Sequence, residues 1–270
     1  MKDYTHSVKS IIVNRLDDDS LFAQCSYVST KQEALAWIIT DTKYFTVKNA
    51  GLEIYRSYKE KAGYKSFPQL SGLQAYLNCG EKWKSILGPD NSFAWDLFSQ
   101  CIKGIIQSET FCYQERGFLQ KQDYLDYWDK VYKNGCYKFT HIEDSNNRWF
   151  EYIGDTPRQY NLFNRSYCVD ISNKDYGRQI TATIIDSYHE ISVQLLCDRG
   201  NTIFRCSADP VRIPDDMCQA GLKNITKLFG QNILLLDRKR INHLVGGLEG
   251  CAHLADILNE IRDCLLRNGR

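Results

Sequence analysis

The stretch RQITATIIDSYHEISVQLLC, residues 178–197, decides the fold that this sequence predicts. Ile180, Ala182 and Ile184 alternate with polar residues, and the apolar residues of EISVQLLC keep the same period of two. This period is typical of strands with one buried face, because successive side chains of a strand point to opposite faces. The intervening DSYHE predicts a turn, so the two strands should form an antiparallel hairpin. We expect His189, in this turn, to face solvent.

Two further strands are expected to complete a meander around this hairpin. YCVDI, residues 167–171, precedes the hairpin and is typical of a first strand. TIFRCSA, residues 202–208, follows it after the turn sequence Asp198-Arg199-Gly200-Asn201. The second half of the chain therefore begins with an antiparallel sheet.

Helical spacing replaces the period of two after this sheet. Apolar residues from Met217 onward recur at helical spacing, and Gly230 marks the end of that helix. A short helix is expected between Asp237, as its N-cap, and the stop sequence Gly246-Gly247. A last helix, residues 251–266, presents an apolar stripe that should cover the sheet.

The first half of the chain repeats this order. Strands are predicted for SIIVNRL, SLFAQCSYV and EALAWIITD, which occupy residues 10–16, 20–28 and 33–41. SGLQAYL from Ser71 resembles AGLKNIT from Ala220, and ILGPDNSFAWDLF resembles LVGGLEGCAHLADIL. In this comparison the first copy is nine residues shorter, and it has Phe93 and Trp95 in place of Cys251 and His253. We expect an internal duplication.

The predicted fold class is α+β, with two tandem related domains that are each a small antiparallel meander sheet with helices packed on one face. Residues 1–114 form the first, degenerate copy. Residues 115–158 form a helical connector rich in aromatic residues, and residues 159–270 form the second copy. The aromatic residues of KQDYLDYWDKVY should pack this connector onto one or both domains.

Composition restricts the classes of function. The 270 residues are 43% hydrophobic and 25% charged, with a net charge of +1, which argues against the basic face that nucleic-acid binding needs. No apolar run approaches the roughly 20 residues of a membrane helix, and MKDYTHSVKS lacks the apolar core of a signal peptide. The eleven cysteines are expected to be reduced thiols of a cytoplasmic protein, with a protein partner or a homo-oligomer as the compatible assembly.

Two cysteines stand where helices are expected to begin. Cys218 follows Asp215 and Asp216, and Cys251 stands two residues before His253. Free N–H groups at a helix start stabilise a thiolate. Thiolate, imidazole and carboxylate together suit zinc or the edge of an iron–sulfur cluster. The sequence therefore predicts a metal site at Cys218, Cys251 and His253, assisted by Asp215 or Asp216, and it identifies no catalytic residue.

Three functions are compatible with these residues. The first is a cytoplasmic accessory protein that binds a metal, an iron–sulfur cluster or a thiol-reactive small ligand through its second domain. The second is a non-catalytic binding or structural module, monomeric or oligomeric, whose cysteines belong to the core. Cys251 favours this module because it lies three residues before Leu254, on the apolar stripe. The third is a thiol-dependent enzyme, which needs a base beside a reactive cysteine.

The region from Arg165 to Leu265 resembles an uncharacterised bacterial domain family of unknown function. Its members have a strand meander, then helices, and a closing Gly-Cys-Thr-His-Leu motif, which here reads Gly250-Cys251-Ala252-His253-Leu254. A more distant likeness is to IscU-type iron–sulfur scaffolds, whose cysteines after the third strand and at a late helix match Cys218 and Cys251. The first cysteine of those scaffolds has no counterpart near residues 173–177. The likeness implies a related fold and leaves cluster assembly in doubt.

Overall fold

The period-two sequences form antiparallel strands in the computed structural model, which describes residues 4–145, 149–154 and 156–268. β7 (Gly177–Asp186) and β8 (Glu190–Asp198) pair as an antiparallel hairpin around the expected turn. Ile180, Ala182 and Ile184 are all buried, as their alternation predicted. The α+β fold class is confirmed.

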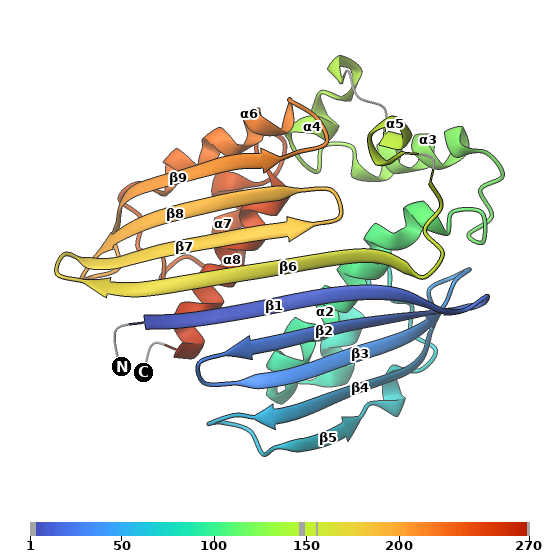
Figure 1. Ribbon diagram of the computed structural model, residues 1–270, viewed down its shortest axis with the longest axis horizontal. Coiled ribbons are helices and arrows are strands. Elements are labelled where there is room, and N and C mark those ends of the chain that lie inside the picture. The colour runs from blue at the N-terminus through green and yellow to red at the C-terminus, as the bar shows by residue number, and fades with distance from the viewer. Residues whose placement is uncertain (1–3, 146–148, 155, 269–270) are drawn as a thin grey trace. The chain divides into compact units, whose positions relative to one another are not determined.

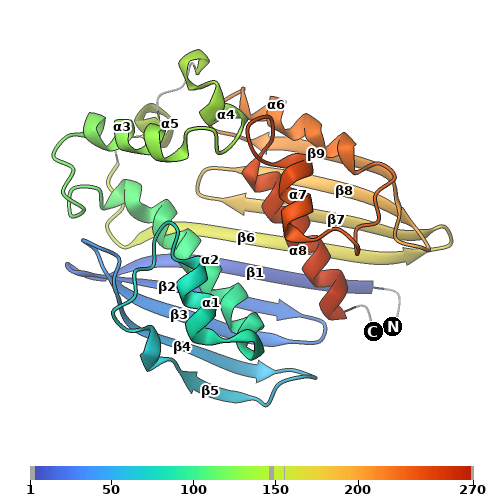
Figure 2. The same ribbon diagram turned by 180° about the vertical axis from the view of Figure 1, so that it is seen from behind.

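The chain divides into two units, each with its own strands and helices (Figure 1). The N-terminal unit consists of Val8–Tyr124 and Thr156–Ser166, and the C-terminal unit consists of Met1–Ser7, Leu125–Asp155 and Tyr167–Arg270. The strand order is β5-β4-β3-β2-β1 in the N-terminal unit and β6-β7-β8-β9 in the C-terminal unit. Helix α2 packs on β2 and β3, and helix α8 packs on β7 and β8 (Figure 2).

The remaining elements follow in chain order. The other strands are β1 (Tyr4–Asp17), β2 (Ser20–Ser29), β3 (Glu33–Asp41), β4 (Val47–Arg56), β5 (Gly63–Ser66), β6 (Asn161–Lys174) and β9 (Ile203–Arg212). The α-helices are α1 (Gly80–Leu87), α2 (Ser92–Ser108), α3 (Lys121–Tyr132), α4 (Tyr137–Thr140), α5 (Trp149–Ile153), α6 (Cys218–Leu222), α7 (Arg238–Val245) and α8 (Ala252–Asn268). Short 3-10 helices are η1 (Pro68–Leu70), η2 (Pro89–Asn91), η3 (Glu109–Phe111), η4 (Ile142–Asp144) and η5 (Lys223–Leu228).

The two units repeat the same succession of element lengths. β1 to β4 contain 14, 10, 9 and 10 residues, and β6 to β9 contain 14, 10, 9 and 10. α1 and α7 contain 8 residues each, and α2 and α8 contain 17 each. The register of β3 on β4 shifts after Glu33 and after Ile39, and that of β8 on β9 shifts after the corresponding Glu190 and Leu196. These elements of one unit therefore have defined counterparts in the other.

Backbone hydrogen bonds correct the correspondence that the sequence comparison predicted. The Gly72 N–H donates to the carbonyl of Val47, the first residue of β4, at 2.9 Å. The Gly230 N–H donates to the carbonyl of Ile203, the first residue of β9, at 2.8 Å. Gly72 therefore corresponds to Gly230 and not to Gly221. The misleading similarity arose because β5 and η1 precede Gly72, whereas α6 and η5 precede Gly230.

This correction reduces the nine-residue difference to two residues and changes the counterpart of His253. From Gly72 to Phe93 the chain advances by 21 residues, and from Gly230 to His253 it advances by 23. The second residue of α2 is Phe93 and the second residue of α8 is His253. Because these two helices have equal lengths, Phe93 is the counterpart of His253, and Trp95 is not.

The helices follow the sequence prediction in part. Asp237 is the N-cap of α7, and its side chain accepts a hydrogen bond from the Arg240 N–H at 2.6 Å, as predicted. The helix expected from Met217 to Gly230 is instead divided into α6 and the 3-10 helix η5. None of the described helices combines the length and the apolar composition that crossing a membrane requires.

Candidate functional site

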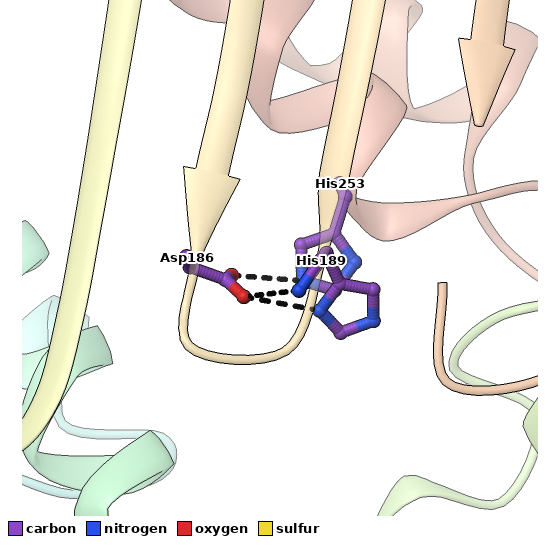
Figure 3. A group of neighbouring side chains, drawn as sticks. All are labelled: Asp186, His189 and His253. Atoms are coloured by element: carbon purple, nitrogen blue, oxygen red, sulfur yellow. Dashed lines mark hydrogen bonds and ion pairs between the residues drawn. The ribbon is translucent and has the colours of Figure 1, made fainter. Parts of the chain in front are cut away.

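Three polar side chains of the C-terminal unit converge at the β7–β8 hairpin (Figure 3). Asp186 ends β7, His189 ends the turn, and His253 extends from the first turn of α8. Nδ1 of His189 lies 3.3 Å from Oδ1 of Asp186, and Nε2 of His253 lies 3.9 Å from Oδ2 of Asp186. The two imidazole rings lie face to face, with centroids 3.9 Å apart and planes tilted by 31°.

This group is distinguished by how closely its ligand atoms approach one another. Each residue offers one nitrogen or oxygen, and these atoms all lie within 4.8 Å of one another. Within the part of the chain that the structure describes, it is the one such group of three His, Cys, Asp or Glu residues. Below, Asp186, His189 and His253 are called the Asp–His–His group.

The carboxylate of Asp186 also builds the turn in which His189 lies. Its Oδ1 accepts the backbone N–H groups of Tyr188 at 2.7 Å and His189 at 2.6 Å. The Asp186 N–H donates to the His189 carbonyl at 2.7 Å, which closes the turn. The Asp186 side chain is fully buried, and His189 is 9% exposed. The prediction that His189 faces solvent was therefore wrong, because the turn folds its ring against Asp186 and His253.

Arg212, the last residue of β9, holds this turn from the neighbouring strand. Its Nη2 donates to the carbonyls of Asp186 at 2.5 Å and His189 at 3.3 Å. Its Nη1 donates to the carbonyl of Ser187 at 3.3 Å. One guanidinium thus binds three carbonyls of the turn and fixes the backbone of two members of the Asp–His–His group.

Helix α5 supports the same turn through Tyr188. The Tyr152 hydroxyl donates to the Tyr188 carbonyl at 2.5 Å. The Trp149 ring packs edge-on against the Tyr188 ring, with centroids 4.7 Å apart. Tyr188 is buried by these contacts, so the segment Leu125–Asp155 contributes directly to the surroundings of the Asp–His–His group.

The β2–β3 hairpin of the N-terminal unit has the same frame, which here means a turn closed by a side-chain oxygen and bound by an arginine. Oγ of Ser29 accepts the N–H groups of Lys31 at 3.3 Å and Gln32 at 3.0 Å, and the Ser29 N–H donates to the Gln32 carbonyl at 2.8 Å. Arg56 donates to the carbonyls of Ser29 at 2.9 Å and Thr30 at 3.0 Å. Like Arg212, it is the last residue of its strand. The turn and its arginine are therefore common to both units.

The side chains that face one another differ between the two hairpins. The positions of Asp186, His189 and His253 in the C-terminal unit correspond to Ser29, Gln32 and Phe93 in the N-terminal unit. A serine and a glutamine are enough to form the turn. The carboxylate and the two imidazoles are additions that the turn itself does not need.

Burial opposes the thiolate form of the two cysteines that were predicted as metal ligands. Burial, together with the nearby thiols of Cys136 and Cys218, raises the pKa of Cys251 to about 12. Burial likewise raises the pKa of Cys218 to about 11, against the opposing effect of Lys138. Burial therefore outweighs the backbone N–H groups on which the sequence prediction relied. Both thiols are protonated at neutral pH.

The two predicted aspartates also lie apart from the Asp–His–His group. Asp215 is buried, its Oδ1 accepts the Met217 N–H at 2.9 Å, and its Oδ2 accepts the Ser145 hydroxyl. Nζ of Lys138 lies 3.8 Å from the same Oδ2. Asp216 is exposed. Of the predicted metal ligands, the structure places His253 alone in the group of three described above.

The sequence analysis did not identify Asp186 and His189 as candidate ligands, and the reason is physical. An aspartate at a strand end, three residues before a histidine, is a visible signal for a turn that the carboxylate closes. The approach of His253 depends on the packing of α8 against β7 and β8, which the local sequence does not show. Only that packing turns a hydrogen-bonded turn into a group of three potential ligands.

Comparison with known proteins shows that this group lies in a region that matches a family of unknown function. Residues 165–267 match a protein family that is described as a protein of unknown function, DUF2889. The matched region contains all three members of the Asp–His–His group. No match was found among curated proteins or among solved structures. The second half of the chain is therefore similar to a domain family of unknown function, as the sequence resemblance suggested.

Proposed function

We propose that this protein binds a divalent transition-metal ion, with zinc as the reference ion, through Asp186, His189 and His253. Imidazole nitrogen and carboxylate oxygen are ligands that zinc and iron(II) accept, and two histidines with one carboxylate form a recurrent ligand set. An iron–sulfur cluster is less well supported, because such clusters are held mainly by thiolates and burial keeps Cys218 and Cys251 protonated.

The distances within the group support this proposal. Neighbouring ligand atoms around a tetrahedral zinc ion lie about 3.3 Å apart, given zinc–ligand bonds of about 2.0–2.1 Å. The 3.3 Å between His189 Nδ1 and Asp186 Oδ1 already meets this spacing. The 3.9 Å between His253 Nε2 and Asp186 Oδ2 requires only a small adjustment of the His253 side chain.

The comparison of the two hairpins is the observation that carries the proposal. Ser29 and Gln32 form the same turn without a charged group or an imidazole. A fully buried carboxylate costs free energy unless charged or polar partners compensate for it. Burying the Asp–His–His group therefore costs more free energy than forming the turn requires. A bound cation would compensate for this cost by contacting all three side chains. We also propose that the two units arose by duplication and that the C-terminal copy alone carries this site.

The surroundings of the group support an accessory role rather than a purely structural one. Three protein ligands leave at least one coordination position for water or a small ligand. The His253 side chain is 21% exposed, which gives solvent a route to that position. All eleven cysteines are free, which supports the expectation of a reducing, cytoplasmic setting. We assign Cys218 and Cys251 to the core.

Zinc titration of the apoprotein in competition with a chromophoric chelator tests this proposal. We expect one zinc ion per chain for the wild type. His189→Gln and His253→Phe introduce the residues that the N-terminal unit has at these positions, so they should preserve the fold. Each should lower zinc affinity by at least about 100-fold, because each removes a direct ligand.

Two further variants separate this site from its alternatives. His243→Gln removes an exposed histidine of the same unit and should leave zinc binding unchanged. Cys251→Ser should also retain zinc, whereas the ligand set predicted from the sequence requires that it lose zinc. A wild type that binds no zinc, or His189→Gln and His253→Phe variants that bind it as tightly as the wild type, would favour the module without a metal.

A further inference from the structure

Two cysteines far apart in the sequence flank one backbone hydrogen bond in the C-terminal unit. Cys136 is the N-cap residue of α4, and Cys251 directly precedes α8. The N–H of Tyr137 donates to the carbonyl of Gly250 at 2.8 Å. The cysteines are therefore the residue before the donor and the residue after the acceptor.

This placement brings the two Cα atoms close together. The described peptide bonds are trans. In a trans peptide, the Cα that precedes an N–H lies on the same side as its hydrogen, and the Cα that follows a carbonyl lies on the same side as its oxygen. Both Cα atoms thus lie beside the hydrogen bond. The hydrogen bond therefore makes Cys136 and Cys251 neighbours across it, the arrangement from which a disulfide can form.

The two cysteines differ in exposure. Cys136 is only partly buried, whereas Cys251 is 8% exposed. A reagent from solution therefore meets Cys136 first.

We propose that Cys136 and Cys251 are a redox-sensitive pair that a small-molecule disulfide converts into an intramolecular disulfide bond. The Cys136 sulfur attacks the small disulfide, forms a mixed disulfide and releases one thiol, which takes up the Cys136 proton. The Cys251 sulfur then attacks the Cys136 sulfur and releases the second thiol, which takes up the Cys251 proton. Two protein thiols are oxidised, and one small disulfide is reduced to two thiols.

The bond would join the segment Leu125–Asp155 covalently to the start of α8. In the reduced protein, the Tyr137–Gly250 hydrogen bond is one link between these two segments, and hydrogen bonds of this kind each contribute only about 1 kcal/mol. Oxidation would add a covalent bond beside this hydrogen bond, and a reductant would be needed to break it. The proposal does not depend on metal binding.

Peptide mapping of the full chain after incubation with oxidised glutathione, in buffer with a metal chelator, tests the proposal. Non-reducing mass spectrometry should show a peptide that joins Cys136 to Cys251, with the loss of two of the eleven free thiols. Cys218→Ser should keep this link. Cys251→Ala and Cys136→Ser should each lose it and should retain a glutathione adduct or a free thiol at the remaining partner.

The map of the wild type decides the question even if a variant fails to fold. A link from Cys136 to Cys218 would overturn the proposal, because Cys218 is the other thiol near Cys251 and Cys136. The persistence of both thiols, or of a mixed disulfide at Cys136 that never resolves, would overturn it as well.

Discussion

Asp186 performs two tasks, of which Ser29 in the N-terminal unit performs only one. Its Oδ1 closes a turn by accepting two backbone N–H groups, and Ser29 does the same with a hydroxyl. Its Oδ2 faces His253, a contact that Ser29 has no second oxygen to make. Each neutral hydrogen bond of the turn contributes about 1 kcal/mol, which a serine also provides. The carboxylate at position 186 is therefore best explained by the charge that it offers to a partner.

The buried thiols make stability depend on alkaline pH. Burial raises the pKa of Cys112 well above its ordinary value of 9.0, and Glu115 and Glu109 raise it further. Above pH 9 the unfolded chain loses the Cys112 proton while the folded chain keeps it. The free energy of unfolding therefore falls as pH rises, by at most about 1.4 kcal/mol per pH unit for this thiol.

Cys112→Ala isolates this effect. We expect the difference in unfolding free energy between the wild type and the variant to shrink from pH 8 to pH 10. Denaturant unfolding at each pH measures it. Cys168→Ala, at a half-buried thiol, should show a smaller change. A difference that stays constant with pH would contradict the prediction.

Single elements were the part of this protein that its sequence predicted best. The β7–β8 hairpin follows from its period of two, and Asp237 was identified as a cap because an aspartate side chain satisfies the first N–H groups of a helix. These features depend on neighbours in the chain. The burial of His189 depends on α8, and the protonation of Cys251 depends on how tightly its surroundings pack, so local pattern predicted neither.

The arginine at the end of β9 offers a test at this scale. Arg212→Met removes three hydrogen bonds to the turn, so we expect zinc affinity to fall about 10–100-fold, the range typical of residues that orient metal ligands. Arg56→Met removes the matching bonds in the N-terminal unit and is the control. It should lower stability by a similar amount and leave zinc affinity unchanged. Equal zinc affinity in the two variants would show that Arg212 does not position the ligands.

The whole molecule contains one hairpin frame twice, with different side chains. The sequence showed the shared order of strands and helices, but it matched Gly72 to Gly221, because the short similarity between residues 71–77 and residues 220–226 has no structural counterpart. The hydrogen bonds from Gly72 to β4 and from Gly230 to β9 give the correspondence that makes Phe93 the partner of His253. Long-range pairing, rather than local resemblance, defines the repeat.

This repeat predicts that a second metal site can be built. The triple variant Ser29→Asp, Gln32→His and Phe93→His gives the N-terminal unit the ligands of the C-terminal unit on a matching turn and helix. We expect its zinc stoichiometry to rise from one to two per chain in the same titration. The double variant without Phe93→His should stay near one tight site. A triple variant that folds and still binds one zinc would show that the two frames are not equivalent.

The separation of the Asp–His–His group into two short segments gives it a recognisable signature. Asp186 and His189 form an Asp-x-x-His sequence at a hairpin, and Gly250 and His253 form a Gly-x-x-His sequence at a helix start. Gly250 cannot be replaced easily, since an added Cβ would lie 2.1 Å from the Val245 carbonyl oxygen. A related chain with both sequences would have the complete set of ligands, and a chain with only one would have the frame alone. Under the proposed function, the two sequences together would identify the relatives that can bind a metal ion.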